Sequence, residues 1–136
     1  MANNYAVFSE FMVMPEDKKP AYEAFITEYM ELCDTDQIDW FGGIELEWDE
    51  LYGHTGVWIH AEENYTDEEL YYLVRGLLKV AESDGPFIVN VAYYCSKPRI
   101  GEFSGGCYAI WQDGDYYADP LVAVMDYIKF HDGKPE

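Results

Sequence analysis

Basic residues are scarce in this sequence. Its 136 residues contain 8 Lys and Arg against 27 Asp and Glu, which gives a formal net charge of -19. Fifteen of the acids lie in residues 20–74, a stretch that contains no Lys or Arg. A surface of this sign repels phosphates, and the basic loop around Lys97 and Arg99 is too small to neutralise a nucleic-acid backbone. The composition therefore argues against direct binding to nucleic acid.

Cysteine and long apolar runs are scarce as well. Cys33, Cys95 and Cys107 are odd in number and match no disulfide framework, which favours the reducing cytoplasm. The sequence does not begin with a basic segment followed by an apolar one, as a signal peptide does. It also has no apolar run that approaches the length of a membrane span. Its hydrophobic content of 49% argues against disorder in spite of the charge. We therefore expect one folded acidic domain over residues 1–136, located in the cytoplasm and without membrane contact.

The common signatures of catalysis are also absent. The serines lie outside any G-x-S-x-G elbow, and the paired glycines lack the partners of a P-loop or dinucleotide-binding motif. Carboxylate pairs for acid–base catalysis stay open, because so many acids are candidates that spacing selects none. We therefore expect a protein without a cofactor that is not an enzyme, and we keep a small enzyme with a carboxylate pair as an alternative.

The patterns that would hold a metal ion are incomplete. Residues 34–45 resemble an EF-hand calcium loop in the spacing of their acids, but Asp39 stands where that loop needs glycine to turn sharply. His54 and His60 share one face of a predicted strand, and six residues of strand span about 20 Å, which is too far for both to hold one ion. We therefore expect no metal site.

Hydrophobic periodicity predicts an α+β fold. Strand patterns cover 5–13, 44–48, 56–61, 87–95 and a hairpin of 107–112 with 116–118. Helical spacing begins near Pro20, Thr66 and Pro120. The order β-α-β-β-α-β resembles the ferredoxin-like split βαβ arrangement, in which two helices cover one face of an antiparallel sheet. The chain would add a β-hairpin and a C-terminal helix to it.

Three local signals refine this prediction. The strand over 5–13 has large apolar side chains at both its odd and its even positions, which predicts a central strand covered on both faces. Thr66 and Glu69 have the spacing of a capping box at the start of the second helix. Asp119 and Pro120 predict the cap and first turn of a short closing helix. The apolar stripe of that helix is Leu121, Val124, Met125 and Ile128.

The stretch GIELEWDE, residues 43–50, is the most unusual part of the sequence. Alternation places its apolar side chains on one face of a strand and Glu45, Glu47 and Asp49 on the other. Same-face residues of a strand lie about 6.6 Å apart, a spacing comparable to that of phosphates along a nucleic-acid strand. A turn over DELYG, residues 49–53, leads into the next strand, and the hairpin would present a row of negative charge.

Aromatic residues accompany these acids. The sequence has 13 Tyr and 4 Trp, more than a core of this size needs, and Trp58, Tyr52 and Tyr65 lie within or beside the acidic stretch. Aromatic anchors surrounded by charge give protein interfaces their affinity and fast association. We therefore predict a partner-binding surface. Its residues are Glu45, Glu47, Asp49, Glu50, Trp58, Glu62 and Glu63.

In charge, size and architecture the chain resembles the small acidic proteins that phages and plasmids use against host defences, the DNA-mimic anti-CRISPR and anti-restriction proteins. The resemblance covers general character along the whole chain and no diagnostic motif. It implies that the acids replace phosphates and occlude the basic nucleic-acid groove of a host nuclease or CRISPR complex in the host cytoplasm. The chain would then be an inhibitor that acts by binding a protein.

The sequence is also compatible with another function and leaves the oligomeric state open. The chain could be a structural or regulatory protein-binding module whose acidity only maintains solubility, because an acid-rich surface often has that role. The sequence also leaves a homodimer open.

Overall fold

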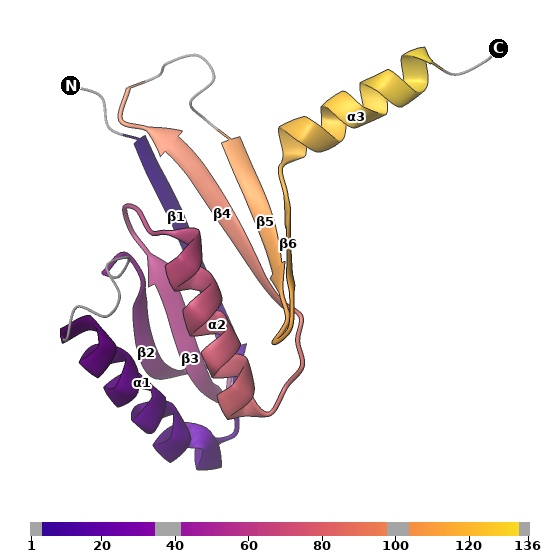
Figure 1. The fold of residues 1–136 in the computed structure, drawn as a ribbon. Helices are drawn as coiled ribbons and strands as arrows, with labels where there is room; N and C mark the ends of the chain where they lie inside the picture. Colours follow the sequence, from indigo (N-terminus) through magenta and orange to yellow (C-terminus); the bar gives the residue numbers. More distant parts are fainter. Residues whose placement is uncertain (1–3, 35–41, 98–103, 134–136) are drawn as a thin grey trace.

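The computed structural model describes residues 4–34, 42–97 and 104–133, and these form an α+β fold around one open, antiparallel sheet of six strands (Figure 1). The strands are β1 (Asn4–Val13), β2 (Glu45–Leu51), β3 (His54–Ala61), β4 (Phe87–Cys95), β5 (Ser104–Ile110) and β6 (Asp115–Ala118). The helices are the 3-10 turn η1 (Glu16–Lys18), α1 (Lys19–Asp34), α2 (Asp67–Ala81) and α3 (Pro120–Asp132). Most of the candidate calcium loop and Arg99 lie outside the described residues.

The strands follow the spatial order β2-β3-β1-β4-β5-β6, and α1 and α2 lie together over one face of the sheet (Figure 1). This inner face carries the alternate apolar side chains that strand periodicity places toward a core. Where the two helices meet, the ring of Phe25 lies against Gly76, and a side chain at position 76 would collide with it. The buried residues include Phe8, Met12, Val57, Ile59, Leu70, Leu73, Leu77, Val89 and Ile110.

A buried carboxylate fixes the start of β2. Glu69 is fully buried in the first turn of α2, and it accepts hydrogen bonds from the Tyr29 hydroxyl (2.9 Å) and from the backbone N–H groups of Gly42 (2.6 Å) and Gly43 (3.1 Å). The predicted cap at Thr66 is confirmed, since its hydroxyl accepts from the Glu69 N–H at 3.2 Å. The Glu69 side chain thus ties α1, α2 and the chain before β2 together.

The central position predicted for β1 is confirmed, but the prediction that it is covered on both faces is wrong. Its residues from Phe8 onward pair with β3, whereas only Asn4–Val7 pair with β4. Past that point the Asn90 N–H donates to the Glu10 carboxylate at 3.1 Å instead of to a strand partner. On the face of the sheet opposite α1 and α2, no helix of the described residues covers β1 (Figure 1). We call this uncovered side of the sheet the outer face.

The β2–β3 hairpin is longer than predicted. The strands continue through Asp49 and Leu51, and the turn consists of Tyr52 and Gly53, both with positive φ (51° and 82°). A two-residue turn with that backbone matches the twist of paired strands and needs residues that tolerate the left-handed region. The pairing of Asp49 with Gly56 therefore keeps Asp49 in the outward row with Glu45 and Glu47.

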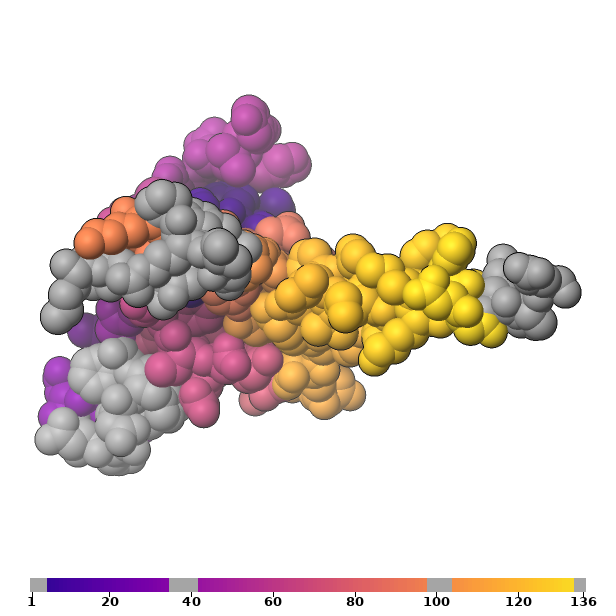
Figure 2. All heavy atoms as spheres, turned by 90° about the horizontal axis from the view of Figure 1, so that it is seen from above, coloured from indigo at the N-terminus to yellow at the C-terminus, as the bar shows by residue number. Residues whose placement is uncertain are grey.

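The last predicted helix forms, but it does not close the fold. The Asp119 carboxylate caps α3 by accepting from the Leu121 N–H at 2.7 Å. Every residue from Pro120 to Gly133 is exposed, because α3 projects from the end of β6 beyond the sheet (Figure 2).

No helix in the described part of the chain is long and apolar enough to cross a membrane.

Candidate protein-binding face

Three of the predicted partner-binding acids form one row. Glu45, Glu47 and Asp49 are exposed, and their positions in the β2–β3 ladder place all three on the outer face. β2 is an edge strand, so one side of the row is open to solvent. Across the ladder, Glu45 stands opposite His60 and Glu47 opposite Trp58. We refer to Glu45, Glu47 and Asp49 as the acidic row.

Trp58 lies beside the acidic row in a fixed orientation. Its indole Nε1 donates to the Ser9 hydroxyl at 2.8 Å, and its ring stacks on the imidazole of His60 with 3.8 Å between centroids. The His60 side chain is buried under the indole. Its Nε2 lies 3.7 Å from a Glu45 carboxylate oxygen, which is too far for a hydrogen bond. An aromatic side chain held in this way loses little conformational entropy when it binds.

Sequence reasoning found Trp58 but missed Ser9 and the role of His60. The available signal was a hydroxyl residue at an outward position of a strand that is otherwise rich in apolar side chains. A period-2 pattern shows that Ser9 and Trp58 share a face only once the β1–β3 register is known. That pairing joins residues far apart in the sequence, so the local pattern could not supply it.

The other three predicted acids do not extend the row. Glu50 pairs with Thr55, and alternation along the strand places it on the inner face. Its N–H donates to the Asp49 carboxylate at 2.7 Å. Glu62 and Glu63 follow β3 and are exposed; together with Glu45 they line a hollow of about 250 Å³ at the opposite end of the hairpin. The acids therefore make one row, with Glu50 beside one end and Glu62 and Glu63 near the other.

Two shallow hollows flank Trp58 on the outer face. One, of about 620 Å³, lies over β1 between Trp58 and His60 on one side and Asn90 and Ala92 of β4 on the other. The second, of about 520 Å³, lies between Trp58 and the turn end of β2, next to Asp49. The indole thus lies between two recesses, which can receive side chains of a protein partner.

The acidic row forms no ion pair with a Lys or Arg side chain among the residues that the structure describes. The ion pairs of Lys18 with Glu82 and of Arg75 with Asp115 lie elsewhere. Burial raises the pKa of the Tyr22 hydroxyl, and the carboxylates of Glu47 and Glu23 raise it further.

The tyrosines are distributed differently from the expectation that many of them serve an interface. Tyr65 packs edge-on against Phe8 under the helices, and its hydroxyl lies 3.1 Å from that of Tyr108, which donates to the Asp67 carboxylate at 2.8 Å. Burial raises the pKa values of Tyr65 and Tyr108. Tyr65 is thus a core residue and not part of the acidic face, whereas Tyr52, 92% exposed, stands at the hairpin turn.

Within residues 4–34, 42–97 and 104–133, no three His, Cys, Asp or Glu side chains come close enough to hold a metal ion. No protein-family model, curated protein or solved structure matches the chain. The geometry of the outer face is therefore the basis for a functional assignment.

Proposed function

We propose that this protein is an acidic inhibitor that binds the basic nucleic-acid groove of a host defence or nucleic-acid-handling protein, as DNA mimics do. The acidic row would occupy positions that phosphates take in that groove, and Trp58 would supply the apolar anchor. Glu50, Glu62 and Glu63 would contact the rim of the groove. The partner is a basic protein, and the contact involves no nucleic acid.

The observation that carries this proposal is the uncovered acidic row beside a fixed indole. Unbalanced carboxylates repel one another and cost stability, so a row without a Lys or Arg partner in the described part of the chain favours a role that requires the charge. Complementary charge speeds association with a basic partner, and an aromatic residue between two recesses supplies affinity that charge alone does not. A solvated surface would require neither the alignment nor the anchor.

We also propose that β1, α1, β2, β3, α2 and β4 form a ferredoxin-like split βαβ unit. The spatial order β2-β3-β1-β4, the antiparallel pairing and the position of both helices on one face support this assignment. In this arrangement the face opposite the helices is free for a partner.

The test is a pull-down of the tagged protein from nuclease-treated bacterial lysate at low and high salt, with mass spectrometry of the retained proteins. The wild type should retain a stoichiometric nucleic-acid-binding protein at low salt and lose most of it at high salt, because screening weakens charge contacts. The variant E45K/E47K should retain none at either salt, with a melting temperature close to that of the wild type since both side chains are exposed.

The matched control is E23K/E28K, which makes the same change in net charge at two exposed positions of α1, on the opposite side of the sheet. It should retain the partner. Equal loss in both variants would show that bulk charge and not the row is responsible, and retention in both would exclude the row as the contact. A partner held equally at high salt would instead favour a binding module whose acidity only maintains solubility.

A further inference from the structure

The apolar stripe of α3 has no partner within the described chain. Leu121, Val124, Met125 and Ile128 recur at helical spacing and are 66%, 55%, 48% and 45% exposed. The main contact of α3 is with the adjacent strand β5. A helix of this length is marginal in water by itself, and helices of folded proteins gain most of their stability from packing of such a stripe.

A second uncovered surface lies on the sheet. The outward residues of β4, β5 and β6 carry no charge, although the chain as a whole has a net charge of -19. Ile88 is 43% exposed and Tyr94 37% exposed, and Tyr94 stacks on Tyr5 of β1 with 4.9 Å between ring centroids. The outward set is Ile88, Asn90, Ala92, Tyr94, Gly105, Cys107, Ala109, Tyr116 and Ala118. We call this set the neutral face.

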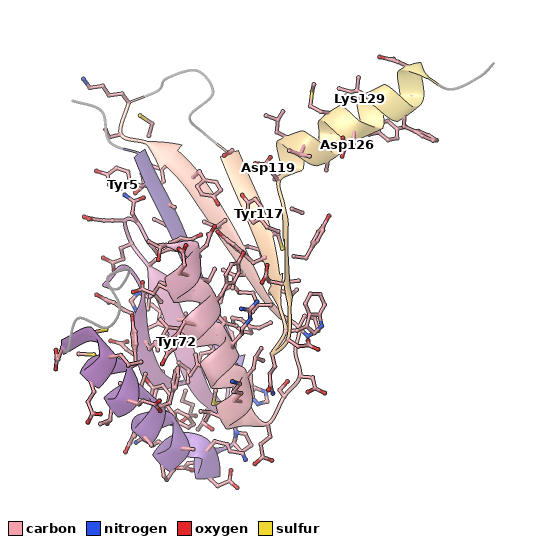
Figure 3. The ribbon with its side chains drawn as sticks, viewed as in Figure 1. Tyr5, Tyr72, Tyr117, Asp119, Asp126 and Lys129 are labelled. Carbon is pink, nitrogen blue, oxygen red and sulfur yellow. The ribbon has the colours of Figure 1, made fainter. Side chains whose placement is uncertain are left out.

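These two surfaces cannot meet within one chain in the observed conformation. β6 ends at Ala118, Asp119 is the cap, and Pro120 already begins α3, so no linker allows the helix to turn back. Figure 3 shows Asp126 and Lys129 on α3 well beyond the sheet, in the direction that leads away from it. Folding α3 back would break the Asp119 cap, which typically contributes about 1 kcal/mol.

We propose that α3 packs its apolar stripe on the neutral face of a second copy of this chain, and that the exchange is reciprocal. The arrangement has twofold symmetry, so each copy supplies one helix and receives one, and the assembly closes as a dimer. A stable dimer buries about 800 Å² per partner, so the helix and the neutral face of each copy would together have to bury that area. The exchange accounts for both uncovered surfaces with one partner.

The distribution of charge agrees with a second copy as the occupant. α3 contains Asp126 and Asp132 against Lys129, so it is nearly neutral, as is the surface that would receive it. A strongly basic partner would find no carboxylate on the neutral face. The acidic row lies at the opposite edge of the sheet, on β2, and stays free in the dimer. The recess between Trp58 and Asp49 stays free as well, whereas the recess lined by Asn90 and Ala92 borders the neutral face. This inference therefore does not depend on the proposed inhibitor function.

The first test is sedimentation velocity of the full chain over a range of concentrations. The wild type should be a dimer, and Met125→Glu and Ala92→Glu should each weaken the dimer at least about a hundredfold, because either would bury an unpaired carboxylate. Both positions are exposed in the single chain, so the variants should stay folded. The matched control Val13→Glu makes the same kind of change at an exposed apolar position outside both surfaces and should stay dimeric.

The second test identifies which surfaces meet. In Met125→Cys, a short bismaleimide should join the new cysteine of one copy to Cys107 of the other, since Cys107 lies on the neutral face and is only half-buried. The covalent dimer should disappear when Cys107→Ser is added. Cross-linking that persists without Cys107 would show that the new cysteine does not lie against Cys107 and would overturn the proposal, as would a wild type that is monomeric at all concentrations.

Discussion

The outer face of the sheet consists of two halves with opposite character. The half formed by β2 and β3 carries the acidic row and the Trp58–His60 stack, whereas the half formed by β4, β5 and β6 presents the neutral face. β1 joins them, and its pairing passes from β4 to β3 after Val7. A single sheet thus offers a charged surface and an apolar surface side by side.

The difference shows why net charge alone describes this protein poorly. A value of -19 suggests a uniformly solvated surface, but carboxylates are concentrated on one half of the outer face and on the helices, and the outward residues of β4, β5 and β6 have none. Charged surfaces favour partners of opposite sign, while neutral apolar surfaces favour partners that also need burial. We therefore expect the two halves to bind different partners and to respond differently to the same change.

The largest stability effect should come from Glu69→Gln. The amide keeps one acceptor oxygen and turns its NH2 group toward one of the Gly42 and Gly43 N–H groups, so the free energy of unfolding should fall by about 2 kcal/mol. Hydrogen exchange should show lost protection mainly in β2 and β3, because Glu69 anchors the chain that leads into β2, while β4 and β5 stay protected.

The matched control for that variant is Glu68→Gln at the neighbouring exposed position, which should leave the stability within about 0.5 kcal/mol of the wild type. A uniform loss of protection over all strands in Glu69→Gln would show that the two halves unfold together and do not differ as we infer.

The sequence predicted the elements well and their tertiary roles less well. Periodicity located the described helices and strands and the outward direction of Glu45 and Glu47, because these depend on neighbours within a few residues. It missed that the Glu69 side chain bonds to Tyr29 and Gly42, since those partners are 40 and 27 positions away. The same applies to α3: its stripe is visible in the sequence, but whether anything covers it depends on the whole fold.

The next prediction concerns ionic strength, which should change the binding affinities of the two halves of the outer face in opposite directions. Raising salt from low to physiological or higher should weaken binding of the captured basic partner about tenfold, because it screens attraction. It should strengthen the dimer, because two chains of charge -19 repel each other and apolar contacts are not screened. Sedimentation and calorimetric titration on the same samples measure both. If both affinities fall with salt, the neutral face is not the dimer contact.

The smallest effect should follow from Ser9→Ala, which removes the acceptor of the Trp58 indole N–H. Water can replace the hydroxyl at this exposed position, so the free energy of unfolding should fall by less than about 1 kcal/mol. The affinity for the basic partner should nevertheless fall about threefold, because the indole must then be ordered on binding. The matched control Ala109→Ser, on the neutral half, should leave that affinity unchanged. Equal affinities in wild type and Ser9→Ala would mean that Trp58 does not act as a fixed anchor, and the acidic row would then bind by charge alone.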